Sequence, residues 1–570
     1  MSGPPQNLEN SPSQWQPTNH PRSTFVERAK TVGKTVLHHA KKHTGVGIVC
    51  AVAYFDPGNW GVDLQAGSQF GYRLLFVVLL AGLFAVFLQA SDVLASRLGC
   101  VTGLDLASHC RLLLHNRPKH PRFYRWFGLY PLYVFSEVAI IATDLAELLG
   151  SAIALCMLFP KLELWHGVLL TAFDVFIVLA LGDPLRGRPV RMFEFLIAGL
   201  VLAVLICMAI IIAKVDVNWA KAFEGYIPSK HIFASGGLYT SVGILGATVM
   251  PHSLFLGSAL ATQDRISPAP KKIKKPTSIT DDSKNSSETE FFQPKTKHQR
   301  IWSAIKESVC APFRVPEASE YSTRATRHCG RENKPLAFVK AHIYHGIVDV
   351  VLSLLGFAVL INSLILILAS AVFFYGSNST GNATPASLFD AYDLIRDLVG
   401  QPAATLFAIA LLAAGQSSSI IATVAGQAVC EGFLNWRVSP ALRRILTRLL
   451  AIIPSMAVAV AVGREGIDAL LVASQVVLSI VLPFITFPLI YCTSSRAIMS
   501  VRKSRSPTPE GVTPISSVDT NATPELESAS DEMVDFSSGK IATTIGGAIC
   551  LLVIAANVYV IVSLARGEEG

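Results

Sequence analysis

The sequence predicts an all-α integral membrane protein with eleven transmembrane helices. Of its 570 residues, 51% are hydrophobic and only 15% are charged, which leaves too little polar surface for a large soluble protein. Apolar runs long enough to cross about 30 Å of hydrocarbon recur along the chain. Residues 1–22 are polar and lack the apolar core of a secretory signal, so we expect the first span to be retained.

The predicted helices follow one another from residue 47 to residue 564. Each is an apolar run of the length that a membrane span requires. The predicted spans are 47–68, 74–96, 127–152, 164–182, 192–213, 236–262, 342–374, 402–429, 446–463, 468–493 and 541–564.

Three polar segments lie outside these spans. In the N-terminal tail, 1–45, residues 23–42 carry apolar side chains on one helical face, which favours a helix lying on the membrane surface; a disordered basic tail is the alternative. The segments 264–340 and 494–540 are rich in Ser, Thr, Pro, Lys and Glu without apolar periodicity. Both are predicted to be disordered cytoplasmic loops that phosphorylation or ubiquitination machinery can modify.

The positive charges predict the orientation in the membrane. With a cytoplasmic N-terminus, about 40 of the 48 Lys and Arg residues fall on the cytoplasmic side, and the C-terminus lies outside or in a lumen. The sequons at Asn378 and Asn382 then fall in an outer loop, where glycosylation is expected. The net charge of +8 thus reflects orientation, and no motif for nucleic acid is present. The ten cysteines form no CxxC pair and predict neither disulfides nor a zinc site.

Two predicted spans contain a proline near the middle. In "YFDPGNW" (54–60), Pro57 removes the hydrogen bond to the carbonyl of Ala53, and Gly58 follows it; in "GATVMPHSLF" (246–255), Pro251 does the same to Ala247. Unpaired backbone at membrane depth is tolerated only where protein or a water-filled cavity satisfies it. Interrupted helices at matching positions indicate a transporter with a site between inverted repeats, here 46–213 and 214–493, followed by an extra helix in 541–570.

The residues at the two breaks describe a site for a metal cation. The carboxylate of Asp56, the amide oxygen of Asn59, the freed carbonyls of Ala53 and Ala247 and the thioether of Met250 would meet there. A soft sulfur ligand adds little for Mg²⁺ or Ca²⁺ and favours later divalent metals. The alternatives are that Met250 fills core space, that Asp56 pairs with a structural base, and that Asn59 caps the second half-helix.

These motifs resemble those of the Nramp family of proton-coupled divalent-metal transporters. The family's first-helix motif Asp-Pro-Gly-Asn stands here at 56–59, and its Met-Pro-His stands at 250–252. The likeness continues in "TDLAELLG" (143–150), "GQSSSIIATVAGQAVCEGFLNW" (415–436) and "SQVVLSIVLPF" (474–484), and the long insertion after the sixth span is similar to fungal members.

The resemblance implies a LeuT-like fold of five plus five helices, with the first and sixth spans discontinuous and one further helix. It implies that Asp56, Asn59, Met250 and the carbonyl of Ala53 or Ala247 bind the metal, and that Gln475 approaches it in an occluded state. The implied activity is symport of protons with Mn²⁺ and Fe²⁺, and also Cd²⁺, Co²⁺ or Zn²⁺, toward the cytoplasm by alternating access. The metal ions and protons are substrates, and no cofactor is expected.

A proton route is predicted along the third span. Glu137, Asp144 and Glu147 lie on one helical stripe, since their spacing places them within about 80°. Arg448 is the predicted counter-ion for Asp144 or Glu147, and His252 can titrate beside Asp56. The family's matching positions form a path for protons from the metal site to the cytoplasm. The alternative is a static lattice of ion pairs that holds two helices together.

Other functions fit the sequence less well. An amino-acid transporter with broken helices would not place an acid and a thioether where a substrate carboxylate binds. A channel or a transport-inactive metal sensor would use the same site without alternating access. No His-Glu-x-x-His motif or nucleophile and base pairing is found in the spans, so an enzyme is not expected. We expect a location in the plasma membrane or in an endosomal or vacuolar membrane.

Overall fold

The structure is a computed structural model that describes residues 46–54, 56–89, 94–171, 191–234, 236–265, 313, 315, 327–376, 386–436, 439–503 and 532–567. These residues all lie in one compact unit, 43–570. Several predictions fall outside the described residues: the tail 1–45 with its helix over 23–42, the second half of the fourth span, the sequons at Asn378 and Asn382, and most of 264–340 and 494–540.

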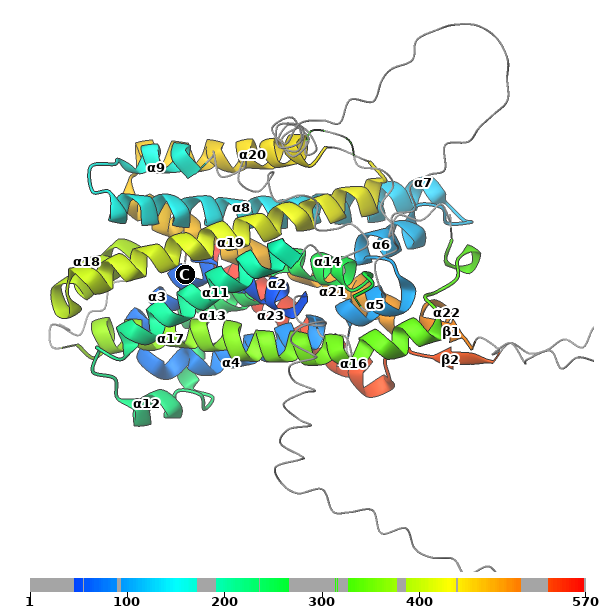
Figure 1. The fold of residues 1–570 in the computed structure, drawn as a ribbon, viewed down its shortest axis with the longest axis horizontal. Coiled ribbons are helices and arrows are strands. Elements are labelled where there is room, and N and C mark those ends of the chain that lie inside the picture. The colour runs from blue at the N-terminus through cyan, green and yellow to red at the C-terminus, as the bar shows by residue number, and fades with distance from the viewer. Residues whose placement is uncertain are drawn as a thin grey trace, which may run out of the picture. The chain divides into compact units, whose positions relative to one another are not determined.

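The described residues form helices almost throughout (Figure 1). The first half of the chain contains α2 (Val46–Val52), α3 (Pro57–Phe70), η1 (Gly71–Leu74), α4 (Leu75–Gln89), α5 (Ala95–Thr102), α6 (Leu106–Leu114), α7 (Pro121–Tyr124), η2 (Arg125–Leu129), α8 (Tyr130–Leu158), α9 (Leu164–Thr171), α11 (Arg191–Ile212), α12 (Trp219–Glu224), η3 (Lys230–Phe233), α13 (Gly237–Thr248) and α14 (Pro251–Leu260). The second half contains η5 (His328–Gly330), α16 (Leu336–Ser353), η6 (Leu354–Val359), α17 (Leu360–Ala369), η7 (Ser370–Phe374), α18 (Leu388–Val399), α19 (Gln401–Leu434), α20 (Pro440–Ala461), α21 (Arg464–Ser494), α22 (Arg496–Met499), β1 (Ser500–Arg502), β2 (Met533–Asp535) and α23 (Lys540–Ala565).

The predicted spans match these helices closely. Among the described residues, nine helical stretches are long and apolar enough to cross a membrane, and one of them contains the break between α13 and α14. They contain ten of the eleven predicted spans, because α3, η1 and α4 run on without a break and join the first two. The fourth span begins with α9 and continues into residues outside the described part. The all-α multispan architecture is therefore confirmed, and the count of eleven is not.

The two interrupted spans lie inside the bundle. The half-helix α3 packs against α17 and α13, α13 packs against α21, and the half-helix α2 packs against α16. Figure 1 shows α8, α19 and α20 running alongside one another, and these helices contact each other directly. The hydrophobic core is contributed by almost all of these elements and includes fully buried residues of α2, α3, α13 and α14. The breaks are therefore enclosed by protein on several sides.

The described ends of the segment 494–540 are ordered, in contrast to the prediction of disorder. They form a two-stranded antiparallel ribbon in which Val501 of β1 pairs with Val534 of β2. Val501 is 1% exposed, so one face of the ribbon packs against the helices. Composition predicts disorder for the segment as a whole, but it cannot reveal two short strands that pair across about thirty intervening residues.

The end of the segment 264–340 is also ordered. The side-chain amide of Asn333 donates to the carbonyls of Ile498 and Ser500. His328 stacks on His109 of α6, with 2.9 Å between the facing ring nitrogens. Burial and the nearby guanidinium of Arg331 lower the pKa of His328 to about 4. The imidazole pair is therefore neutral at physiological pH, and it holds this segment against α6.

The packing of α13 on α21 predicts an effect of Gly246→Ala. A Cβ at this position would lie 2.0 Å from the carbonyl oxygen of Gln475 and 2.7 Å from the amide nitrogen of Ser479. Because both atoms belong to the backbone, the helices must separate, and overpacking of this kind costs about 1–3 kcal/mol. The melting temperature of the purified protein in detergent should fall.

Gly199→Ala in α11 is the matched control. A Cβ there meets nothing within 4 Å. Because alanine has the higher helix propensity, we expect no loss of stability and a gain of up to about 1 kcal/mol. Equal losses in the two variants would contradict the close packing of α13 on α21.

Candidate metal-binding site

The first break separates α2 from α3. Helix α2 ends at Val52, and α3 begins at Pro57 with Asp56 as its N-cap. The Asp56 carboxylate accepts a hydrogen bond of 2.8 Å from the amide of Asn59, and a proline at the first helical position costs no hydrogen bond. The possibility that Asn59 caps this half-helix is therefore wrong, since Asp56 has that role and Asn59 occupies the first turn.

The second break has the same local design. Helix α13 ends at Thr248, α14 begins at Pro251, and the intervening Met250 is at the N-cap position with an extended backbone. The carbonyl of Met250 accepts from the hydroxyl of Ser253 at 2.7 Å. The thioether of Met250 is fully buried and makes no cap hydrogen bond. Each proline thus starts the second half of its helix.

One side chain links the two breaks. The Nδ2 atom of Asn59 donates to Oδ1 of Asp56 at 2.9 Å and to the carbonyl oxygen of Ala247 at 3.0 Å. The carbonyl of Ala247 is the one predicted to be freed by Pro251, four residues later. Three of the predicted metal ligands are therefore in direct contact, although they are separated by up to 191 residues in the sequence.

The structure adds Asn362 of α17, which sequence reasoning missed. Its Nδ2 atom donates to the carbonyl of Tyr54 at 2.7 Å and to Oδ1 of Asn59 at 3.3 Å. It thereby satisfies backbone that the first break exposes. The signal for it was an amide within the apolar run "VLINSLIL", since polar side chains in spans usually bond across helices.

Gln475 lies beside the first break. A Cβ on Gly58 would lie 1.8 Å from its Nε2 atom, so the amide packs directly against the Gly58 backbone. Among the described residues, four buried oxygen atoms at or next to the breaks have no hydrogen-bond partner: Oδ2 of Asp56, Oε1 of Gln475, Oδ1 of Asn362 and Oγ1 of Thr248. Unsatisfied buried acceptors are costly, and a bound cation would satisfy them. The residues present therefore fit a cation.

The site does not resemble a conventional metal centre. Within the described ranges, no group of three or more His, Cys, Asp or Glu side chains could hold an ion. The candidate ligands are instead one carboxylate, amides, backbone carbonyls and a thioether. For Ala53, the structure places the residue in the turn that follows α2, with its amide bonded to the carbonyl of Cys50. Metal binding by any of these residues stays a prediction.

The acidic stripe of α8 begins next to the first break. Gly150 packs so closely on Pro57 that a Cβ there would lie 1.9 Å from the proline's Cβ, and Glu147 lies one turn away from Gly150. Asp144 follows, with Oδ1 at 2.9 Å from Nη1 of Arg448, as predicted. The stripe thus leads from the break along α8 over about 15 Å to Glu137.

Arg443 is a second cation on this stripe that the sequence analysis did not include. Its Nη2 atom lies 2.6 Å from Oε2 of Glu137. Arg443 and Arg448 both belong to α20 and reach α8 one after the other, so each pairs with a different acid. The pairing is set by the packing of α20 on α8, which the sequence does not reveal.

His252 does not bond Asp56. Its Nδ1 atom lies 3.2 Å from the hydroxyl of Thr143 in α8, whereas the Asp56 carboxylate accepts hydrogen bonds from Asn59 of α3. The second residue of α14 thus contacts α8, and the titration of His252 beside Asp56 stays a prediction. Thr143 directly precedes Asp144 in the chain, so His252 contacts α8 beside the acidic stripe.

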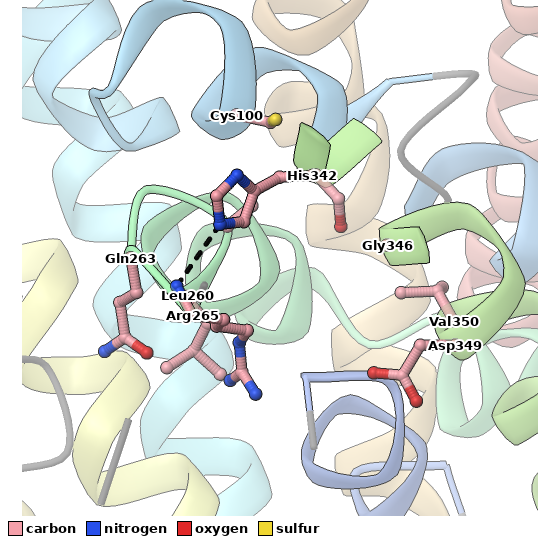
Figure 2. Close-up of a pocket in the computed structure, with 10 residues that line it drawn as sticks. Cys100, Leu260, Gln263, Arg265, His342, Gly346, Asp349 and Val350 are labelled. Carbon is pink, nitrogen blue, oxygen red and sulfur yellow. Dashed lines mark hydrogen bonds between the residues drawn. The ribbon is translucent and has the colours of Figure 1, made fainter. Parts of the chain in front are cut away.

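A cavity of about 40 Å³ lies away from the breaks, where α5, α14 and α16 meet (Figure 2). It is lined by Cys100, Arg265, His342 and Asp349, among others, and His342 accepts a hydrogen bond from the amide of Arg265. The mixed charges do not favour either an anion or a cation. This cavity contains none of the predicted metal ligands.

The chain matches a family model described as natural resistance-associated macrophage protein-like, over residues 47–281 and 321–509. The chain belongs to the Nramp family. The manganese transporter pdt1 of Schizosaccharomyces pombe is 39% identical over 92% of this chain and 86% of its own length. The iron transporter SMF3 of Saccharomyces cerevisiae is 35% identical, with 94% and 98% covered. Both relatives are named as metal transporters. The predictions that the chain belongs to the Nramp family and that it is a transporter rather than an enzyme are therefore confirmed.

A solved structure supports the Nramp fold. The manganese transporter of Eremococcus coleocola is 27% identical and superposes with a TM-score of 0.64, covering 94% of this chain and 89% of that chain. The predicted all-α membrane fold with broken first and sixth spans is confirmed.

The buried pair of Arg448 and Asp144 predicts a stability effect. The two side chains are 2% and 1% exposed, so Arg448→Met would leave a carboxylate without its counter-charge. Breaking such a pair costs about 3–5 kcal/mol, which should lower the melting temperature strongly.

Arg396→Met in α18 tests the specificity of this effect. Arg396 pairs with Asp393 at 2.7 Å, but both side chains are more than 40% exposed. Removing an exposed pair costs about 0–1 kcal/mol. A fall in melting temperature as large as that of Arg448→Met would contradict a special role for the buried pair.

Proposed function

We propose that the chain is a proton-coupled symporter that carries divalent transition-metal ions such as Mn²⁺ and Fe²⁺, and also Cd²⁺, Co²⁺ or Zn²⁺, toward the cytoplasm. The observation that carries this proposal is the link that Asn59 makes between the carboxylate of Asp56 and the carbonyl of Ala247. It brings both helix breaks to one place. The names of the relatives, which include manganese and iron transporters, agree with it.

The ligand chemistry supports a divalent cation as the substrate. Asp56 supplies the formal negative charge, and Asn59, Gln475 and the break carbonyls supply neutral oxygens that replace water. The buried acceptors Oδ2 of Asp56 and Oε1 of Gln475 gain a partner when a cation binds. The thioether of Met250 favours the softer transition metals over Ca²⁺ and Mg²⁺.

The acids of α8 support proton coupling. Asp56 can hold a metal or a proton, and an ionised carboxylate with neither is costly at this depth. Pro57 contacts Gly150, one turn from Glu147, so a proton that the metal displaces has a carboxylate close by. Asp144 and Glu137, with Arg448 and Arg443, continue the route. The alternative function of these pairs is to hold α20 on α8.

The geometry of the two breaks supports alternating access. The half-helices before and after each break can change their angle without breaking helical hydrogen bonds, because the backbone between them is already non-helical. The membrane potential contributes about 2.3 kcal/mol per charge per 100 mV to inward movement of the cations. A channel would conduct without saturation, and a metal sensor would bind without uptake.

The first test is metal and proton uptake by the full chain in proteoliposomes. With an inward proton gradient, Mn²⁺ uptake should saturate and the lumen should acidify. Asp56→Asn should reduce Mn²⁺ uptake by more than about 100-fold, since even residues that only support a metal ligand change affinity 10–100-fold. The measurement uses metal-quenched and pH-sensitive dyes inside the vesicles.

Glu147→Gln separates a proton relay from a static lattice in the same assay. A relay predicts a folded protein with slowed proton flux, whereas a lattice predicts loss of folded protein. Uptake that does not saturate, or Mn²⁺ uptake that does not depend on the proton gradient, would contradict the proposed symport.

Met250→Ala tests the origin of metal selectivity. Removing the sulfur should lower competition by Cd²⁺ against Mn²⁺ uptake and raise competition by Ca²⁺, with a change of about tenfold in their ratio, or about 1.4 kcal/mol. Met250→Leu, which keeps the volume, is the control for packing and should show the same change. Unchanged discrimination in both variants would exclude the thioether as the selective ligand.

A further inference from the structure

One buried carboxylate in α3 has no role in the site described above. Asp63 is 1% exposed, and its Oδ2 atom has no hydrogen-bond donor among the described residues. No described cationic side chain forms an ion pair with it. Burying an ionised carboxylate alone is costly, so such a group requires a cation or a proton.

Asp63 lies on the same face of α3 as the metal-binding motif. Asp56, Asn59 and Asp63 are spaced by three and four residues, which places them within about 60° around the helix. At 1.5 Å per residue, Asp63 lies about 10 Å further along the axis than Asp56. It is on the side of the break that leads away from α2.

The contacts of its neighbours show where this face points. One turn before Asp63, the Oδ1 atom of Asn59 accepts from Asn362 of α17. One turn after it, a Cβ on Gly67 would lie 2.5 Å from the carbonyl oxygen of Leu366, also in α17. Gly58 and Gly61, on the other side of α3, pack against α21. Asp63 therefore faces the seam between α3 and α17.

Three unsatisfied acceptor atoms belong to residues along this seam, and the hydroxyl of Ser363 in α17 is also without a hydrogen-bond partner among the described residues. Asp56 and Asp63 each leave Oδ2 without a donor in the described part of the chain, and Asn362 leaves Oδ1. A row of buried oxygens without donors is an environment that stabilises a cation. No sulfur atom comes from the three residues, in contrast to the break, where Met250 lies.

We propose that Asp63 forms a second binding position for divalent cations, from which the ion passes to Asp56. The inference rests on the proposed function and deepens it. A carboxylate and amide oxygens bind hard and borderline divalent cations alike, so this position should accept Ca²⁺ as well as Mn²⁺. Selection then takes place one step later, at Met250. A cation held at Asp63 raises the fraction of time that a metal ion is available to Asp56 when the metal concentration is low.

The test measures initial Mn²⁺ uptake by the full chain in proteoliposomes over a range of Mn²⁺ concentrations. Asp63→Asn should raise KM for Mn²⁺ by about tenfold and leave kcat within about twofold, because only loading is weakened. Asp63→Glu keeps the charge and should restore KM. Asp105→Asn is the control, since Asp105 is equally buried but accepts two hydrogen bonds from Ser108 of α6. Its KM should not change.

Binding separates this inference from the proposed function. Mn²⁺ titration of the purified protein, followed by electron paramagnetic resonance, should show residual binding in Asp56→Asn that Asp63→Asn removes when the two are combined. Residual binding without any uptake by the unaltered chain would contradict the transport proposal and leave the Asp63 site supported. For Asp63→Asn, an unchanged KM for Mn²⁺, whether or not kcat or the proton flux changes, would overturn the inference. In the binding experiment, the absence of residual Mn²⁺ binding in Asp56→Asn would overturn it as well.

Discussion

The structure depends on how two stretches of non-helical backbone are satisfied inside a membrane protein. Lipid offers no hydrogen bonds, so each break requires partners from the protein or from its substrate. The amide of Asn59 bonds both the carboxylate beside its own break and the carbonyl of Ala247 at the other. Asn362 covers the carbonyl of Tyr54 in the same way. Because these bonds join segments that are far apart in the chain, they hold the two breaks together at one place.

Close helix packing supports this arrangement. Gly150 of α8 admits Pro57, Gly58 admits the amide of Gln475, and Gly246 admits the backbone of α21. In each case a larger side chain would collide with the neighbouring helix. Glycine therefore allows the helices to pack closely, as small residues commonly do in membrane proteins. Glu137 and Asp144 of α8 each pair with one arginine of α20, Arg443 and Arg448 respectively. The residues proposed to bind the metal and to carry the proton are thus neighbours of the residues that pack the helices.

The breaks and their chemistry could be predicted from the sequence because proline acts locally. Pro57 and Pro251 exclude a continuous helix wherever the rest of the fold lies, and an acid next to one of them marks a site. Asp56 as a helix cap was within reach too, since an acid directly before a proline is a common helix start. The sequence could not reveal that Asn362 meets Asn59 across 303 residues, or that Arg443 pairs with Glu137 across 306. Such pairs are fixed only when the helices pack.

The central claim is that both breaks bind a single divalent ion. Crystals of the full chain grown with Mn²⁺ and measured at the manganese absorption edge test it most directly, because anomalous scattering locates the metal without reference to transport. The account predicts an anomalous peak within bonding distance of Asp56, Asn59 and Met250, next to the carbonyl of Ala53 or Ala247. Ordered manganese at other places only, with the two breaks free of anomalous density, would contradict it.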